Sequence, residues 1–293
     1  IGTASNTAEI NLSVTQNGGL LPAGTSSQGV GSLLRDENGA IIPGLGHFSV
    51  DSFSSGGFHS LALKGNVSFE GNVSIQTPGS ISVGTGGVIR ANGDVSLTAG
   101  HIALGQAFRP PALDDEAVIL FTRTTAEGVT SSYTFAPTGG TGHLSVNADL
   151  IDIGNLSFDG IGTASFSAAH GDIRGNGTLS TAADLTFHAG QIYPTTYGDF
   201  SIFAYGGKSV TIERGDQRHL PLSAGGSLSI FASEIHQGGT LRAPIGTIRL
   251  GYDGATGSAP SNPLAGNTIA APVTTNLTLA SGSVTSVSVI DPI

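Results

Sequence analysis

Apolar and polar residues alternate in short stretches along most of the chain, and one such stretch recurs. It begins with an apolar residue, a hydroxyl or other small polar residue and a second apolar residue, and a further apolar position follows after a small residue. Copies occur at residues 95–102, 144–151, 185–192 and 228–235, with a looser copy at 277–284. Alternation with a period of two predicts a β-strand that directs one face inward.

The spacing of the copies predicts how these strands are arranged. The copies start 49, 41, 43 and 49 residues apart, and short strands of the same kind lie between them, for example at 153–158 and 164–166. Such spacings correspond to two turns of about 20–25 residues, a length at which a chain winds around a small core and stacks on itself. The prediction is an all-β fold, a right-handed parallel β-helix. A β-propeller of similar period is the minor alternative, although its Gly-His and Trp-Asp signatures are absent.

Two insertions interrupt the pattern, and we expect both to project from the coil. The first, at about 105–142, contains strand-like runs at 118–124 and 131–135 that predict a hairpin. We divide the remaining chain into a Gly-rich leading segment, residues 1–50, with short strands and loops, and the coil itself, residues 51–293.

The second insertion, at about 193–226, is also predicted to be a hairpin. Residues 199–204 and 209–214 both alternate like strands, and a Tyr-Gly-Gly-Lys sequence separates them. Two adjacent glycines between two strands are typical of a tight hairpin turn.

Composition agrees with a stacked coil. The chain has 45 glycines, which suit corners that need positive φ, and only 11% charged residues against about 25% in ordinary domains. Equivalent side chains on stacked strands lie about 4.8 Å apart, so like charges repel, and we expect charge to be concentrated in the loops. A net charge of −10 argues against nucleic acid as a partner.

The chain has no cysteine, which excludes disulfides, Cys-ligated metal centres and thiol nucleophiles. No apolar run approaches the roughly 18 residues that a membrane-spanning helix requires. Residue 1 is Ile, Met is absent and no basic and apolar leader is present, so we expect a mature or excised piece of a longer protein.

Several longer strings resemble one protein family. They are residues 56–63 (GGFHSLAL), 189–196 (AGQIYPTT), 222–228 (LSAGGSL) and 235–248 (IHQGGTLRAPIGTI). These strings are similar to repeats of the filamentous haemagglutinin family, and the resemblance covers roughly residues 50–250. It implies a secreted or bacterial cell-surface location and export through an outer-membrane transporter of the two-partner type. The Asn-Pro-Asn-Gly-type motifs of the family's secretion domain are absent, which fits an internal or released fragment.

Arg214, Gly215 and Asp216 form the first candidate site. They follow a predicted strand in the second insertion, and the tripeptide resembles the integrin-binding signal that some adhesins of this type carry. A solvated loop without a binding role is the alternative reading.

Asp114, Asp115 and Glu116 form the second candidate site, in the first insertion, and Asp149 with Asp152 forms another acidic pair. Paired acids could bind a cation or serve a polysaccharide-cleaving β-helix. Such an enzyme generally needs a basic residue above the sugar carboxylate, and lysine is nearly absent, so exposed loop acids are the simpler interpretation.

We therefore expect a non-enzymatic adhesin segment, a β-helical stalk that attaches cells or surfaces. No cofactor is expected, and the dispersed histidines do not indicate a metal site. Its partners would be a host or bacterial cell-surface receptor or glycan. Two alternatives remain: a filament-forming subunit that associates end to end, and a polysaccharide-binding or polysaccharide-cleaving β-helix.

Overall fold

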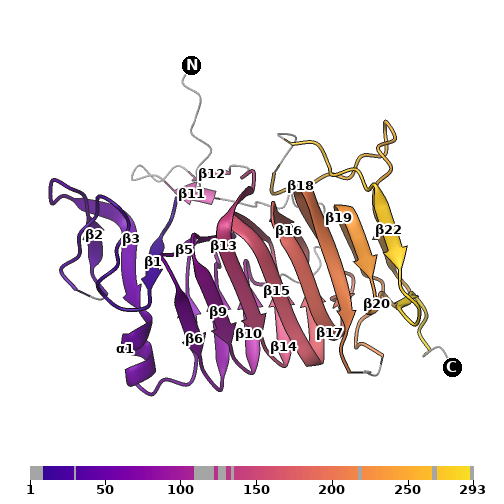
Figure 1. Cartoon of the computed structure of the whole chain (residues 1–293), viewed down its shortest axis with the longest axis horizontal. Coiled ribbons are helices and arrows are strands. Elements are labelled where there is room, and N and C mark those ends of the chain that lie inside the picture. The colour runs from indigo at the N-terminus through magenta and orange to yellow at the C-terminus, as the bar shows by residue number, and fades with distance from the viewer. Residues whose placement is uncertain are drawn as a thin grey trace.

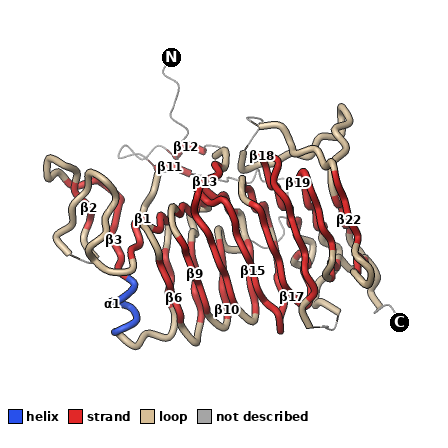
Figure 2. The backbone as a smooth tube through the Cα atoms, viewed as in Figure 1, coloured by secondary structure: helices blue, strands red, loops and turns tan. Residues whose placement is uncertain are grey.

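The computed structural model describes residues 9–29, 31–108, 135–216, 220–265 and 269–290, and the backbone of 122–124 and 130–132. Its regular structure is almost entirely β-strand, which confirms the expected all-β fold. Figure 2 shows the strands side by side along the long axis and a single short helix near one end. That helix, α1 (Val50–Ser55), is the one that the described residues form.

The strands of the first half of the chain are β1 (Leu12–Thr15), β2 (Leu33–Arg35), β3 (Ile41–Ser49), β4 (Leu61–Leu63), β5 (Val67–Phe69), β6 (Val73–Gln76), β7 (Ser80–Val83), β8 (Val88–Ala91), β9 (Asp94–Thr98), β10 (His101–Leu104), β11 (Thr122–Thr124), β12 (Thr130–Ser132) and β13 (Thr138–Asn147). Those of the second half are β14 (Leu150–Ile153), β15 (Leu156–Gly175), β16 (Gly177–Thr181), β17 (Asp184–Pro194), β18 (Asp199–Arg214), β19 (Ser227–Gln237), β20 (Thr240–Arg242), β21 (Thr247–Leu250), β22 (Asn276–Leu279) and β23 (Val284–Ser286).

Most strands pair in parallel with a later strand. Between the two, the chain makes one turn around the core and comes back to the same side. Val73 lies opposite Val95, and Leu144 lies opposite Ala164. We call each such return to the same position a rung. The strands of successive rungs therefore form the stack that runs across Figure 1.

The recurring stretches do not all lie on the same side of the stack. Val95 is directly opposite Leu144, so the chain between them makes one rung, which carries the first insertion. Leu144 and Leu185, by contrast, are two rungs apart. Leu228 is opposite Phe200 on another side, so its alignment with the first three copies was wrong. The same local pattern recurs because every side of the stack needs inward apolar residues.

The core lies inside the stack and consists of the inward residues of each rung. Phe158, Phe166 and Phe187 are fully buried, and their rings stack with centroid separations of 6.5 Å and 4.9 Å. Val95, Leu144, Ala164, Leu185, Val210 and Ile235 line one side of this core. Burial of such a continuous apolar interior stabilises the stack, because each rung covers the apolar residues of its neighbour.

Asparagine side chains bridge the corners of adjacent rungs. The Oδ1 of Asn72 accepts a hydrogen bond from the amide of Asp94 at 3.0 Å, and the Oδ1 of Asn155 accepts one from the amide of Thr178 at 2.9 Å. Asp94 and Thr178 come just before Val95 and Leu179, the first residues that pair with the preceding rung. The side chains thus supply acceptors that the backbone does not.

The second insertion is not a projecting hairpin, and this prediction was wrong. Both halves of β18 belong to the stack: Phe200 lies opposite Leu228 in parallel, and Val210 lies opposite Leu185 in parallel. Gly206 and Gly207 have φ of 73° and 76° and turn the chain from one side of the stack to the next. Paired positive-φ glycines suit a corner as well as a hairpin, so the local sequence did not distinguish the two.

The first insertion contains the predicted antiparallel hairpin. Strands β11 and β12 pair in antiparallel register, with Arg123 opposite Ser131, in a separate two-stranded sheet. The rest of the predicted strand 118–124 and parts of 131–135 lie outside the described residues.

The two ends of the stack differ. At the amino-terminal end, β1 pairs in parallel with β5 and β3, and β2 covers β3 in antiparallel register. The helix α1 buries Val50 and Phe53 at the same end. At the other end β22 and β23 form the last described strands, and β22 has no buried residue.

Candidate functional site

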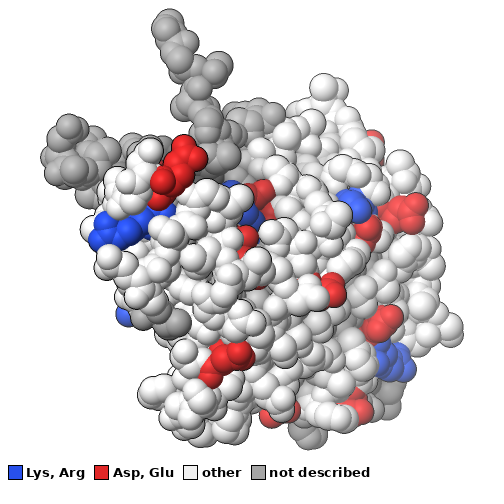
Figure 3. All heavy atoms as spheres, turned by 60° about the vertical axis from the view of Figure 1, so that its left-hand side comes forward, with Lys and Arg blue, Asp and Glu red and all other residues white. Residues whose placement is uncertain are grey.

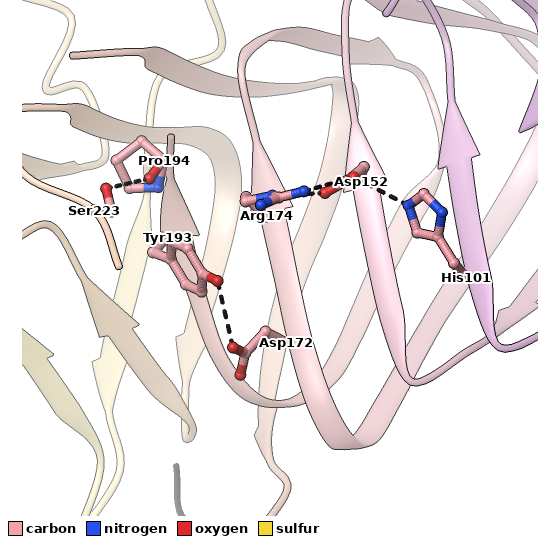
Figure 4. A network of polar contacts seen from close by, with 7 residues as sticks. All are labelled: His101, Asp152, Asp172, Arg174, Tyr193, Pro194 and Ser223. Atoms are coloured by element: carbon pink, nitrogen blue, oxygen red, sulfur yellow. Dashed lines mark hydrogen bonds and ion pairs between the residues drawn. The ribbon is translucent and has the colours of Figure 1, made fainter. Parts of the chain in front are cut away.

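Charged side chains are few and scattered on the face shown in Figure 3. The expectation that charge is concentrated in the loops is wrong for a group of strand residues on the outside of the stack. Asp152 lies on β14, and Asp172 and Arg174 lie on β15. Together with His101 on β10 and Tyr193 on β17, they form what we call the polar cluster (Figure 4).

Strand register brings the cluster together. Asp152 lies opposite Arg174, and Arg174 lies opposite Tyr193 on the next rung. Neighbouring strands are about 4.8 Å apart, so side chains at these positions form a continuous row. Opposite charges on adjacent rungs attract, which is how a stack accommodates charge on its strands.

Arg174 and His101 both contact the carboxylate of Asp152. Arg174 donates from Nε to Oδ1 at 2.8 Å and from Nη2 to Oδ2 at 2.9 Å, and the Nε2 of His101 lies 3.0 Å from Oδ2. The Asp152 side chain is 13% exposed, so this bidentate pair is partly shielded from water. The hydrogen bonds that Arg174 donates to Asp152, and secondarily the charge of Asp152, raise the pKa of Arg174 against the opposing effect of burial.

Asp172 forms the second half of the cluster. It accepts hydrogen bonds from the Tyr193 hydroxyl at 3.3 Å and from the Gln191 amide at 3.2 Å. Burial, and then the charge of Asp172, raise the pKa of Tyr193 to about 12. Tyr193 therefore remains a neutral hydrogen-bond donor at physiological pH.

These contacts limit what the cluster can do chemically. Arg174 holds the carboxylate of Asp152 in place by two hydrogen bonds. A carboxylate held in this way is a hydrogen-bond acceptor of fixed orientation. The arrangement suits recognition of a polar group better than proton transfer.

A pocket of about 240 Å³ lies beside the cluster. Asp152 forms part of its wall, and Ser82, Gln106 and Phe108 contribute a hydroxyl, an amide and an aromatic ring. The guanidinium carbon of Arg174 is 5.7 Å from the centroid of the Phe108 ring. The pocket therefore combines an apolar wall with a few polar groups, as small-molecule sites commonly do.

A larger and open hollow of about 500 Å³ lies on a different side of the stack. Its floor is a row of outward hydroxyl residues in register, namely Ser96, Ser145, Ser165 and Thr186. Asp94, His143 and Asp184 line its margin. Burial raises the pKa of Asp184, but hydrogen bonds from Lys208 and Ser209 outweigh that effect, and the net pKa is lowered.

The Arg214-Gly215-Asp216 tripeptide lies against the stack and does not project from it. The amide of Gly215 donates to the carbonyl of Ala189, and the amide of Asp216 donates to the carbonyl of Ala169, both at 2.8 Å. A Cβ on Gly215 would lie 2.6 Å from the Ala169 oxygen, so backbone packing explains this glycine. The side chains of Arg214 and Asp216 are nevertheless exposed.

The remaining acidic candidates are not assembled into a site by the described residues. Asp114, Asp115 and Glu116 lie outside them. Asp149 and Asp152 do not act as a pair, because Asp152 contacts Arg174 and His101 and no hydrogen bond between the two acids occurs in the described structure. The sequence contains almost no lysine that could serve as the basic residue beside these acids. In the structure the basic residue beside Asp152 is Arg174.

The six Asn-x-Ser/Thr sequons largely coincide with the corner asparagines. The side chains of Asn11, Asn72 and Asn155 accept backbone hydrogen bonds from the next rung, and Asn66 is 5% exposed. Their role in the fold accounts for these asparagines without glycosylation.

The structure and the comparisons add no further site. Among the described residues, no three His, Asp or Glu side chains are grouped as a metal ion would require, and no helix could cross a membrane. No family model, curated protein or solved structure matches the chain.

The sequence did not point to Arg174, His101, Tyr193 or Phe108. Arg174 follows Asp152 by one rung, a sequence separation of 22. The rung length was therefore the signal that could have identified the pair, since outward residues one rung apart are neighbours.

Proposed function

We propose that the chain is a right-handed parallel β-helix that acts as stalk and adhesive surface in a secreted, haemagglutinin-like bacterial exoprotein. Its parallel strands, each opposite a partner one rung further along, are the observation that supports this proposal most directly. Backbone hydrogen bonds between rungs and a continuous apolar interior give a stiff body whose stability accumulates rung by rung.

The proposed role is non-catalytic. Asp152 is matched by Arg174, and in the row of Ser96, Ser145, Ser165 and Thr186 the described structure shows no hydroxyl bonded to a histidine or a carboxylate. The Thr163 hydroxyl in the same hollow contacts the Nδ1 of His143, and we take this contact as part of the polar surface. Export would use an outer-membrane transporter of the two-partner type, and the partner outside the cell would be a receptor or glycan on a host or bacterial surface.

Adhesion is tested directly with the purified chain. Beads coated with it are expected to bind epithelial or bacterial cells more than beads coated with a non-adhesive protein, and soluble chain should compete. If coated and control beads bind equally to all cells offered, the adhesive role is wrong.

The contribution of the tripeptide needs its own variant. Asp216 contacts His170 at 2.6 Å, and both side chains are largely exposed. Asp216→Glu changes the spacing of the charges with little effect on folding, and Glu37→Asp, on another exposed loop, is the matched control. Loss of cell binding by Asp216→Glu alone would assign adhesion to Arg214-Gly215-Asp216, and unchanged binding would remove that assignment.

End-to-end association is a second candidate, favoured by the carboxy-terminal rung. Of thirteen exposed large apolar side chains among the described residues, seven lie between positions 245 and 290. Leu277 is opposite the buried Ile235 yet is 44% exposed, and Leu279 is 60% exposed. Exposed apolar residues on an edge strand favour pairing with a further strand, which a second copy of the chain would supply in the proposed filament.

Self-association is measured by sedimentation velocity over a range of concentrations. Leu279→Lys should abolish any association, whereas Leu222→Lys, at a fully exposed site elsewhere, should not. A monomer at every concentration would exclude the filament role for this chain.

A further inference from the structure

The pocket beside the polar cluster has the composition of a sugar-binding site. We propose that it binds a single neutral sugar residue of a glycan. The inference rests on the proposed adhesive function, in that it names the chemistry of one contact with the partner surface. It depends on four features of the described residues: the aromatic wall, the fixed acceptor, the available hydroxyl and the balance of charge.

The aromatic wall is Phe108. Its ring lines a space of about 240 Å³, which is of the order needed for one small ring. A sugar ring is polar at its edge and presents C–H groups on its faces. An aromatic ring accommodates such a face, while hydrogen-bonding groups around it meet the hydroxyls.

The fixed acceptor is Asp152. An ionised carboxylate has about four lone-pair positions. Three are occupied, by the Nε and Nη2 of Arg174 and by the Nε2 of His101. The carboxylate can therefore accept one more hydrogen bond on Oδ1, from a group in the pocket. Because Arg174 holds it by two bonds, its orientation does not have to be fixed when the ligand binds.

Ser82 supplies a free hydroxyl. It lies in the same outward column as Ala103 and Asp152 and lines the pocket. Its side chain has no hydrogen-bond partner among the residues that the structure describes, whereas the Thr85 hydroxyl accepts from the Gly65 amide. Ser82 can both donate to and accept from a sugar hydroxyl.

The charges at the pocket favour a neutral ligand. Arg174 does not line the pocket, but its guanidinium carbon lies 5.7 Å from the centroid of the lining Phe108 ring, so it would repel a cation bound there. An anion such as a uronate would meet Asp152 and a chain of net charge −10. A neutral polyol avoids both penalties and still satisfies the acceptor and the hydroxyl.

The test uses saturation-transfer NMR on the whole chain with single monosaccharides as probes. The neutral probes are galactose, glucose, mannose and N-acetylglucosamine, and the charged probes are glucuronate and choline. We expect at least one neutral sugar to bind, in the millimolar range typical of small polar ligands, and the charged probes to bind about tenfold more weakly or not at all.

Variants place the binding in the pocket. Phe108→Ala should weaken sugar binding by about tenfold, and Ser82→Ala by a few-fold. Phe58→Ala, at a ring that is 63% exposed near the amino-terminal end, is the matched aromatic control and should bind as the parent does. Thermal unfolding of each variant establishes whether it is folded. If Phe108→Ala does not fold, Ser82→Ala, which removes only a hydroxyl, still tests the pocket.

Three outcomes would overturn the proposal. They are no binding of any neutral sugar, binding that both pocket variants retain, and preferential binding of glucuronate or choline. Failure here differs from failure of the adhesive function, because the coated beads can bind cells through another surface while the pocket binds no sugar.

Discussion

Arg174 donates two hydrogen bonds to Asp152, a residue that precedes it in the chain by one rung of the stack. The pair links two strands, β14 and β15, through their side chains as well as their backbones. It also holds Asp152 in the wall of the pocket. One contact therefore contributes both to stability and to the candidate binding site.

Replacing Arg174 should destabilise the stack. Arg174→Ala leaves the partly buried Asp152 with His101 as its remaining side-chain partner. We expect a cost of about 1–2 kcal/mol, because hydrogen bonds to charged groups are among the stronger ones and this pair is partly exposed. Urea unfolding followed by circular dichroism measures the loss. Lys64→Ala, at an exposed residue, should change the free energy of unfolding by less than about 0.5 kcal/mol. Equal effects of the two variants would contradict this role of Arg174.

The pair also shows how far the sequence could predict the site. Asp152 was recognised as one half of an acidic pair with Asp149, but a basic partner was sought among the lysines. To predict the contact between Asp152 and Arg174, one has to know how many residues make one rung. The spacing of the repeats gave only the length of two rungs, or of one rung that carries an insertion. Phe108 was not predictable at all, because its place in the wall depends on how the first insertion leaves the stack.

The strands of the fold were easier to predict from the sequence than the site was. Inward apolar residues must alternate with outward polar ones, so the strands around Val95, Leu144 and Leu185 followed from local pattern alone. Which side of the stack a strand occupies does not follow from that pattern, and Leu228 was misplaced. Gly206 and Gly207 were assigned to a hairpin turn. The strands on either side of them show the same alternation in a hairpin as at a corner of the stack, so the sequence pattern does not distinguish the two.

The amino-terminal end should lose stability in mild acid. His47 is 3% exposed, its Nε2 lies 3.0 Å from the Thr15 hydroxyl, and its Nδ1 has no partner among the described residues. Burial lowers the pKa of His47 below its ordinary value of 6.5. The unfolded segment then binds a proton near pH 6.5 that the folded segment does not. Stability is complete above that pH and falls as the pH decreases toward the folded pKa.

Amide hydrogen exchange at Val14 and Thr15, measured at pH 7.5 and 5.5, tests this. After correction for the intrinsic pH dependence of exchange, protection should fall at pH 5.5 in the parent chain. His47→Gln should remove most of that dependence, whereas His59→Gln, at an exposed residue, should retain it. Protection that is independent of pH in the parent chain would refute the assignment.

Gly171 should not tolerate a side chain. A Cβ at this position would lie 1.5 Å from the carbonyl oxygen of Asp149 on the preceding rung, where backbone cannot move away easily. Gly171→Ala is expected to cost about 1–3 kcal/mol in the free energy of unfolding. Gly19→Ala, where the nearest atom is a side-chain oxygen of Asn17 at 3.3 Å, should be close to neutral. Urea midpoints that agree for the two variants would show that the rungs separate more readily than the structure indicates.

Two variants of the Asn155-Leu156-Ser157 sequon can distinguish a structural role of Asn155 from a role in glycosylation. Asn155→Ala removes the acceptor for the Thr178 amide, so we expect a loss of about 1–2 kcal/mol. Ser157→Ala removes the same sequon but leaves the corner intact. The Ser157 hydroxyl is fully buried and has no partner among the described residues, so its removal should be neutral or stabilise by up to about 1 kcal/mol. Thermal unfolding of both variants from an unglycosylated preparation decides between the roles. If Ser157→Ala is as destabilising as Asn155→Ala, the hydrogen bond at the corner is not what fixes this asparagine.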